Sequence, residues 1–333
     1  MTMHFKISML LFAMAVSPGI FILQGDEVKP AQASDDSKQK LNLHPVPEIA
    51  IDPESRKLID DAIRQKDYQG AANRLLQLIE KNPNSPQLLV TMGRVLFLDG
   101  QFLNSAVAFK KAEKLHPLKE EDRFTVAMCF VKLEHRDWAQ GELQKLAQAN
   151  MKNPLYPYWL ARLDYDDTKY AAGVEKLKRT VELDPKFVRA YDNLGLCYEG
   201  LGEFEEAIKN YEKARELNRQ QKPSSAWPPL NYGILLLGRG NLEEAEACLR
   251  EALSYDPKLP QVHFQLGTLQ EKQSKYREAI EEMNLAVSLD PSYAEPHYGL
   301  SRLYRTTGDL KEAEAAAATF QKLKQEKRKS KPQ

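Results

Sequence analysis

Three amide side chains recur at near-regular intervals in the chain, at Asn193, Asn231 and Gln265. An Asn or Gln side chain carries both a donor and an acceptor, so it can bind a backbone N–H and a backbone C=O at once. A row of such side chains can therefore hold an extended peptide of any sequence. The alternative is that these amides are ordinary solvated surface residues.

Aromatic and basic side chains recur close to the amides in the sequence. An aromatic ring supplies apolar anchoring, and an arginine guanidinium can bind a carboxylate through two parallel hydrogen bonds. We therefore expect a partner-binding surface that favours acidic proteins or peptides. Besides the three amides, its expected residues are Tyr158, Arg162, Trp227, Phe264, Tyr298 and Arg302.

The residues that most often carry catalysis or bind metals are scattered. None of the six histidines belongs to an H-E-x-x-H or similar pair. His263 and His297 are interpreted as replacements for an aromatic core residue. We expect no catalytic residue, no metal site and no cofactor. The three cysteines are interpreted as small buried apolar residues, namely Cys129, Cys197 and Cys248.

The composition is that of a folded protein without a dominant charge. Apolar residues make up 42% of the 333 residues and charged residues 28%. The 47 basic and 47 acidic residues cancel, so no overall field attracts nucleic acid or an anionic membrane. We expect no nucleic-acid partner.

The intervals between the candidate residues reflect an internal repeat of about 34 residues. When the repeats are aligned, the residues at one position of the repeat form a column. One column contains only small side chains, and its spacing is constant except for a longer step between Ala207 and Ala245. The four extra residues of that step fall within the polar stretch 219–226. The column consists of Ala71, Ser105, Ala139, Gly173, Ala207, Ala245, Ala279 and Ala313.

Each repeat has the pattern of two helices joined by a tight turn. Asp52, Ser85 and Asn153 each precede a proline, the order expected where a helix begins. Glycines at 100, 202, 240 and 308 suit the end of the first helix. Ala207 and Gly195 are small, which lets the paired helices approach closely. One pair cannot bury its apolar surface alone, so neighbouring repeats must stack into an all-α solenoid.

These columns resemble the tetratricopeptide repeat. Its pattern of aromatic, Leu-Gly, aromatic, Ala and aromatic is matched by Tyr191, Leu194, Gly195, Tyr198, Ala207 and Tyr211. Arg219 replaces the closing proline, and Ile59 and Arg136 depart from the pattern in the first and third repeats. The resemblance implies a right-handed superhelix of antiparallel helix pairs whose first helices line a concave groove. We expect eight repeats over residues 52–327, starting near 52, 86, 120, 154, 188, 226, 260 and 294.

The N-terminal region differs from the repeats. An apolar run, 7–16, is followed by a second one at 20–23 and by Ala31-Gln32-Ala33, a small-x-small cleavage pattern. We expect residues 1–33 to be a signal peptide that exports the protein to the periplasm or the cell exterior. The alternative is a membrane anchor formed by residues 7–23. Residues 34–51 are interpreted as a polar linker, and residues 328–333 as a basic tail.

The resemblance leads to two hypotheses about function, because this fold serves many unrelated partners. In the first, the chain is a non-catalytic scaffold that binds partner proteins or extended peptides in its groove. In the second, it is the substrate-recognition subunit of an enzyme system, such as a glycosyltransferase, whose catalytic domain is on another chain. The second is suggested by the amide row, which is similar to the asparagine ladder of long superhelical members of the family.

Overall fold

The computed structural model of the protein describes residues 52–329. The expected signal segment, the linker and residues 330–333 of the tail lie outside these residues. The described part consists of α-helices joined by short turns and contains no strand, which confirms the predicted all-α class. Its helices are α2 (Pro53–Arg64), α3 (Tyr68–Lys81), α4 (Pro86–Leu98), α5 (Phe102–Leu115), α6 (Glu120–Lys132), α7 (Arg136–Ala149), α8 (Leu155–Asp166), α9 (Tyr170–Leu183), α10 (Val188–Leu201), α11 (Phe204–Gln220), α12 (Trp227–Gly238), α13 (Leu242–Tyr255), α14 (Pro260–Lys272), α15 (Tyr276–Leu289), α16 (Ala294–Thr307) and α17 (Leu310–Lys329).

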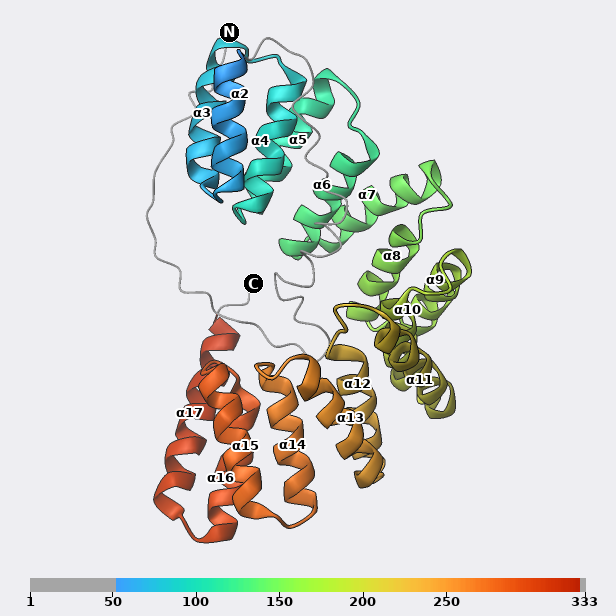
Figure 1. The fold of residues 1–333 in the computed structure, drawn as a ribbon, viewed down its shortest axis with the longest axis vertical. Helices are drawn as coiled ribbons and strands as arrows, with labels where there is room; N and C mark the ends of the chain where they lie inside the picture. The colour runs from blue at the N-terminus through green and yellow to red at the C-terminus, as the bar shows by residue number, and fades with distance from the viewer. Residues whose placement is uncertain (1–51, 330–333) are drawn as a thin grey trace. The chain divides into compact units, whose positions relative to one another are not determined.

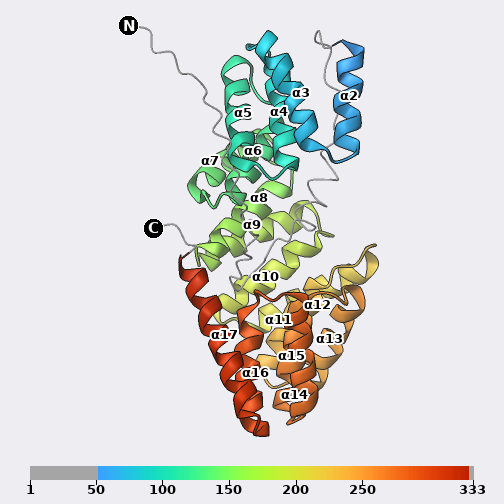
Figure 2. The same cartoon turned by 90° about the vertical axis from the view of Figure 1, so that its left-hand side faces the viewer.

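The described residues form two compact units, 52–232 and 233–329. In the first unit, each helix from α2 to α11 contacts the next one along the chain (Figure 1). The second unit repeats this arrangement, and α14, α15, α16 and α17 lie side by side in both ribbon views (Figure 2). Each unit therefore buries its apolar side chains between sequential helices, as a solenoid does.

The predicted helix starts are largely confirmed. Asp52 and Ser85 cap α2 and α4, and their side chains accept hydrogen bonds from the backbone N–H groups of Ser55 and Leu88 at 2.8 and 3.4 Å. The third prediction is off by one residue. Pro154 is itself the cap of α8, and the Asn153 side chain accepts a hydrogen bond from the N–H of Leu155 at 3.1 Å.

Small residues lie where paired helices approach most closely, as predicted. Ala207 and Ala245 are fully buried. A Cβ added to Gly195 would lie 2.4 Å from the ring of Tyr211, which fills the contact between α10 and α11. Only glycine leaves room for that ring, so the fold requires glycine at this position.

The turn inside each helix pair contains one residue in the left-handed region, and this holds with or without glycine. Four of these residues are the glycines that the sequence identified, with φ between 76° and 91°. The other four have side chains and φ between 58° and 62°. All eight occupy one column, namely Lys66, Gly100, Glu134, Thr168, Gly202, Gly240, Ser274 and Gly308. The backbone path is thus a property of the fold rather than of the glycines.

The four-residue insertion at 219–226 lengthens one helix and adds a closed loop. Helix α11 has 17 residues, whereas α9 and α13 each have 14. The buried Asn218 side chain donates a hydrogen bond to the backbone C=O of Ser225 and accepts one from its N–H, both at 2.8 Å. This pair of bonds closes the loop before α12 begins.

Candidate functional site

The predicted site residues lie on the first helices of successive pairs but in two different units. Helix α8 carries Tyr158 and Arg162, α10 carries Asn193, and α12 carries Trp227 and Asn231, all within the first unit. The second unit contains the remaining four, Phe264, Gln265, Tyr298 and Arg302.

Tyr158 is buried rather than open to a partner. Its ring packs against Phe187 and Trp159, with centroids 5.0 and 5.7 Å away, and the Arg189 guanidinium lies 5.4 Å from its centroid. Burial raises the pKa of the Tyr158 hydroxyl, and the nearby Asp192 carboxylate raises it further. In the described structure Tyr158 therefore belongs to the packing between helices.

Asn193 is also buried, and both ends of its amide are engaged. Its Nδ2 donates to the backbone C=O of Arg189 at 2.8 Å, one helical turn earlier. Its Oδ1 accepts from Nη1 of Arg162 at 3.4 Å. The bond from Arg162 links α8 to α10, so the amide has a structural role alongside any role in binding.

Asn231 is bound to a residue that the sequence analysis did not single out, Asp192. Nδ2 of Asn231 donates to Oδ2 of Asp192 at 3.0 Å. Burial raises the pKa of Asp192 to about 7, although the bond from Asn231 and the charge of Arg162 favour the ionised form. Asp192 is 5% exposed, so a carboxylate here has little contact with water.

Several buried polar atoms in this region have no hydrogen-bond partner, and two of them are complementary in chemistry. One is the second oxygen of Asp192, Oδ1, and the other is the indole Nε1 of Trp159 on α8, whose side chain is 7% exposed. A buried donor or acceptor without a partner costs roughly 1–3 kcal/mol. An acceptor for the indole N–H and a donor for the carboxylate would remove that cost. We call Trp159, Arg162, Asp192, Asn193 and Asn231 the α8–α12 polar cluster.

Asp192 was not predicted as a site residue because the prediction followed columns of similar residues. In its column six of the other seven copies are aromatic or aliphatic, for example Phe124, Tyr158 and Leu230, and the first copy is Arg56. A single acid in a mostly apolar column is the signal that would have found it. Asp192 is buried because residues in this column pack between helices. It can ionise because an acid stands where most other copies have an apolar residue.

In the second unit the predicted residues are more open, but the arginine is already paired. Phe264 is partly buried and packs on Tyr293 at 5.4 Å between centroids, and Gln265 is half-buried. Tyr298 is exposed. Arg302 forms an ion pair with Glu271 of α14. Binding by these residues, and by those of the first unit, stays a prediction.

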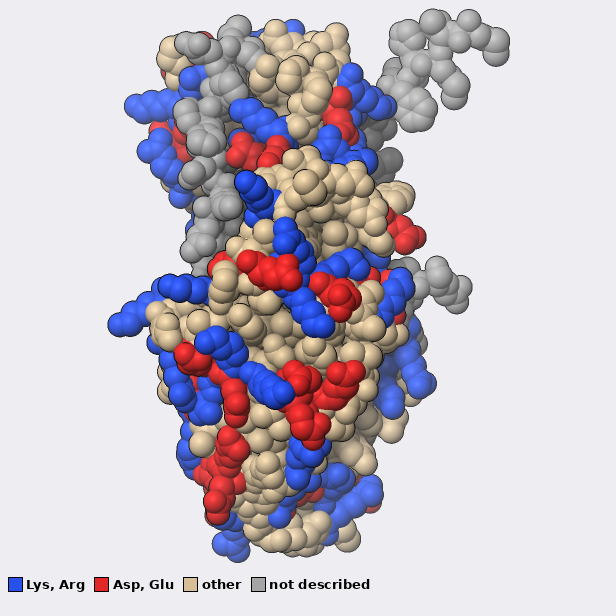
Figure 3. Space-filling model, turned by 90° about the vertical axis from the view of Figure 1, so that its right-hand side faces the viewer, with Lys and Arg blue, Asp and Glu red and all other residues tan. Residues whose placement is uncertain are grey.

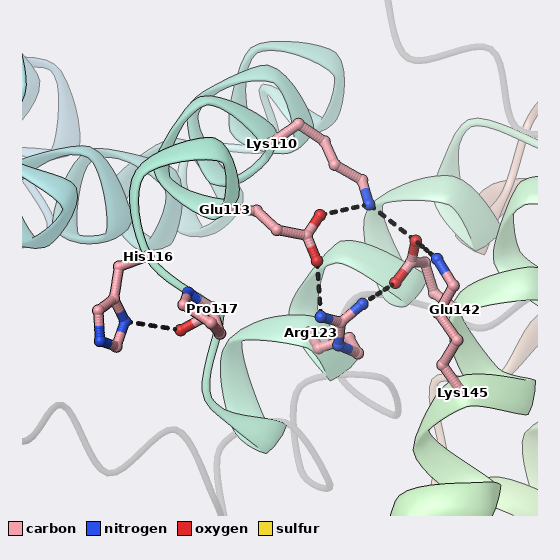
Figure 4. Close-up of polar contacts among 7 residues, drawn as sticks. All are labelled: Lys110, Glu113, His116, Pro117, Arg123, Glu142 and Lys145. Atoms are coloured by element: carbon pink, nitrogen blue, oxygen red, sulfur yellow. Dashed lines mark hydrogen bonds and ion pairs between the residues drawn. The ribbon is translucent and has the colours of Figure 1, made fainter.

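A second polar cluster of the first unit links α5, α6 and α7 (Figure 4). Glu142 accepts from Lys110 at 2.7 Å, from Arg123 at 2.9 Å and from Lys145 at 3.1 Å. Glu113 accepts from the same Lys110 and Arg123, at 2.9 and 2.6 Å. Burial alone would raise the pKa of Glu142, but the hydrogen bonds from the two lysines lower it below its ordinary value. We call these five residues the α5–α7 ion cluster.

The buried His263 and the three cysteines belong to the packing of the described residues. Both ring nitrogens of the buried His263 face acceptors, with Nδ1 2.8 Å from Glu282 and Nε2 2.9 Å from the C=O of Pro257. All three cysteines are buried, as predicted, and burial raises the pKa of the Cys129 thiol to about 11. Within residues 52–329, no three His, Cys, Asp or Glu side chains are grouped as metal ligands.

Charges of both signs are mixed on one face of the molecule. On the face shown in Figure 3, basic and acidic side chains lie next to one another over most of the surface. None of the helices in the described range combines the length and the apolar character that a membrane span needs.

Comparison with known proteins gives consistent family matches. Two family models, both described as tetratricopeptide repeat, match the chain, one over residues 187–258 and the other over 56–119, 230–294 and 264–326. Together they cover more than half of the chain.

Relatives of known description share the repeats at low identity. The chain is 22% identical over 281 residues to the BBSome complex member BBS4 homolog of Drosophila melanogaster, a match covering 80% of this chain and 56% of the relative. It is 24% identical over 281 residues to the TPR repeat-containing protein YpiA of Bacillus subtilis, covering 81% and 62%. The chain thus spans about three fifths of the length of these relatives.

A solved tetratricopeptide repeat protein from Parabacteroides merdae has the same fold. It superposes with a TM-score of 0.62 and 17% identity, covering 75% of this chain and 97% of the other. At this identity the likeness concerns the fold alone.

Proposed function

Since the chain belongs to the tetratricopeptide-repeat family, we propose that it is a non-catalytic scaffold that binds a partner protein or an extended peptide through its first helices. One of the relatives is described as a member of a protein complex, the BBSome, which is consistent with such a role. The family alone does not identify where a partner binds, so the proposal depends on one local observation.

That observation is the pair of unsatisfied atoms in the α8–α12 polar cluster. The Trp159 indole offers a donor and Asp192 Oδ1 an acceptor, and both are buried without a hydrogen-bond partner. A peptide backbone carries the complementary pair of groups, a C=O and an N–H. We assign the partner's C=O to Trp159 and its N–H to Asp192. Binding would then satisfy two groups that the free protein leaves unpaired.

The amides have a supporting role in this proposal. Asn231 holds one oxygen of Asp192, and Asn193 is held between Arg189 and Arg162. These bonds fix the orientation of the carboxylate and the position of α8 against α10, so the two unsatisfied atoms are held in place for the partner's backbone. Gln265, in the second unit, is assigned a separate backbone contact.

The experiment is affinity capture from the native host with the wild-type chain, followed by titration calorimetry on the captured partner. Trp159→Phe removes the indole N–H and retains an aromatic ring, and Asp192→Asn removes the charge at nearly constant shape. Each is expected to weaken binding about tenfold or more, since an unsatisfied partner group costs roughly 1–3 kcal/mol. Lys209→Gln, at an exposed position of α11, is the matched control.

The pH dependence of binding adds a second readout. A partner N–H that donates to Asp192 favours its ionised form, so wild-type affinity should increase as pH rises through about 7. Asp192→Asn should bind independently of pH over this range. Equal affinities for wild type, Trp159→Phe and Asp192→Asn would contradict the proposed site. Capture of a chain with a nucleotide-sugar-binding domain would instead favour the recognition-subunit hypothesis.

We also propose that the protein is exported, on the basis of the apolar segment and the Ala31-Gln32-Ala33 pattern. N-terminal sequencing of the native protein should find a chain that begins near Ser34. An intact Met1 in the membrane fraction would favour the anchor, and an intact Met1 in the cytosol would contradict export.

A further inference from the structure

One aromatic side chain on the first helices differs from its equivalents in being open to solvent. Tyr298 of α16 is 52% exposed, whereas Tyr158, in the same column of the repeat, is 3% exposed. Phe264, also in this column, is partly buried. An exposed aromatic ring on a folded surface is a common anchor for protein partners.

Tyr158 and Phe264 are each covered by an aromatic ring from a later position in the chain. Phe187 packs on Tyr158 at 5.0 Å between centroids, and Tyr293 packs on Phe264 at 5.4 Å. Each covering residue lies twenty-nine positions after the ring it covers. The residue at that distance from Tyr298 is Lys327, which is not aromatic. The aromatic neighbour that Tyr298 does have, Phe320, comes from a different position of the repeat.

Cations lie close to Tyr298 and to its neighbouring ring, although one of them, Arg302, is ion-paired with Glu271. Phe320 of α17 packs on Tyr298 at 5.3 Å between centroids, with the rings tilted by 42°. The Arg302 guanidinium lies 5.5 Å from the Tyr298 centroid, and the Lys324 ammonium lies 5.4 Å from that of Phe320. Arg305 and Lys322 are exposed on the same two helices. Two aromatic rings, each with a cation close to it, thus form a surface between α16 and α17.

From this arrangement we propose that Tyr298, Arg302, Phe320 and Lys324 form a docking surface for an aromatic side chain carried by an acidic peptide of a partner protein. The aromatic side chain takes the position that Phe187 and Tyr293 take in the other repeats. Acidic neighbours on the peptide meet the Lys324 ammonium and compete with Glu271 for Arg302. The inference rests on the proposed function in one respect, that the partner is a protein, but it concerns a different unit from the α8–α12 polar cluster.

The test is an array of synthetic acidic peptides, each with one central Trp, Tyr or Phe, probed with the full chain. Two matched arrays replace the aromatic residue by Ala or the acidic residues by Lys. Wild type should bind the aromatic acidic array and neither matched array. Tyr298→Ala should lose about five- to tenfold in affinity for the best peptide, and Tyr298→Phe should retain it. Lys324→Gln, which keeps both rings, should show a smaller loss and a weaker salt dependence.

Each contrary outcome has a definite meaning. Equal binding to the Ala array, or unchanged binding by Tyr298→Ala, would overturn the inference. Loss of array binding in Asp192→Asn with none in Tyr298→Ala would place the peptide on the other unit, which overturns this inference and leaves the proposed function intact. Concentration-dependent self-association that Tyr298→Ala abolishes would identify a second copy of the chain as the occupant and would equally overturn it. Thermal melts of each variant check that the fold is retained, as expected for a half-exposed side chain.

Discussion

The two polar clusters of the first unit are built from similar residues but are satisfied to different degrees. In the α5–α7 ion cluster, Glu142 receives hydrogen bonds from three cations, and each carboxylate oxygen of Glu113 has a partner as well. In the α8–α12 polar cluster, Asp192 receives one bond, from Asn231, and its second oxygen has none. Burial raises the pKa of Asp192, whereas cations lower the pKa of Glu142 despite burial.

This difference separates a structural cluster from a candidate binding site. A buried charge is tolerated when hydrogen bonds and opposite charges compensate for the water it loses. Glu142 meets this condition within the chain, so the α5–α7 ion cluster needs no further partner. Asp192 does not meet it, and a ligand can supply what is missing. The degree of satisfaction, rather than the number of charged residues, points to the site.

The largest expected effect is from Glu142→Ala. The substitution leaves Lys110 and Arg123 with only one of the two carboxylates they share, and it should lower the free energy of unfolding by about 3 kcal/mol. Chemical denaturation measures this. Glu175→Ala, which removes an exposed ion pair to Lys178, is the control and should stay within about 0.5 kcal/mol of wild type. Similar values for the two variants would show that the cluster contributes no more than surface charges do.

An intermediate effect is expected from Asn231→Ala. It removes the one hydrogen bond that Asp192 receives, leaving a buried carboxyl without a partner on either oxygen, and should cost about 1–3 kcal/mol. The loss should be larger at pH 8 than at pH 5, where Asp192 is protonated. Asn284→Ala, at an exposed amide of α15, is the control and should have little effect. A pH-independent loss would show that Asp192 is not the group affected.

A pH-dependent effect is expected from Asp192→Asn. The folded-state pKa of Asp192 is raised to about 7 from an ordinary value of 3.8. Its stabilising contribution is therefore fully present below about pH 4 and is lost as pH rises through about 7. Thermal melts from pH 4 to 8 should show that the variant gains stability relative to wild type as pH increases. A constant difference over this range would contradict the raised pKa.

The smallest effect is expected in the pKa values of two histidines, His263 and His297, which occupy the same column. His263 has a carboxylate partner, whereas His297 has none among the described residues. Hydrogen bonding to Glu282 raises the pKa of His263, whereas Ala316 stands at the equivalent position near His297, and burial lowers the pKa of His297. The His263 contribution to stability is thus fully present below pH 6.5 and is lost as pH rises through its folded pKa.

Nuclear magnetic resonance titration of the two imidazoles checks this contrast. In Glu282→Gln the His263 pKa should fall, and the His297 pKa should be unchanged. An unchanged His263 pKa would show that Glu282 does not set the protonation of that ring. Equal pKa values for the two rings in wild type would remove the contrast altogether.

Much of the fold could be predicted from the sequence because residues in the same column of the repeat make the same helix–helix contact in each copy. The small residues at Ala207 and Ala245 lie buried, and the tight space at Gly195 is filled by Tyr211. Glycines marked four of the turns. The other four left-handed residues, such as Lys66 and Thr168, could not be predicted, because their side chains give no local sign of that conformation.

The candidate site was predicted only in outline, because residues that share a column of the repeat can differ in how exposed they are to solvent. Asn193 and Asn231 were expected to be free for a partner, whereas both are buried and hydrogen-bonded within the chain. Tyr158 and Tyr298 share a column, yet one is covered by Phe187 and the other is half exposed. Residues on other helices decide these differences, and the repeat does not specify them.

The sequence by itself determined the helix pairs, their stacking order and the family, because every repeat has the same short-range periodicity and the same local steric limits. Only the tertiary structure decided which polar groups are satisfied. The partners of Asp192 and Glu142 come from helices that the repeat brings together but whose residues differ from copy to copy. Burial makes each missing hydrogen bond costly, so three-dimensional neighbours rather than sequence columns distinguish the α8–α12 polar cluster from the α5–α7 ion cluster.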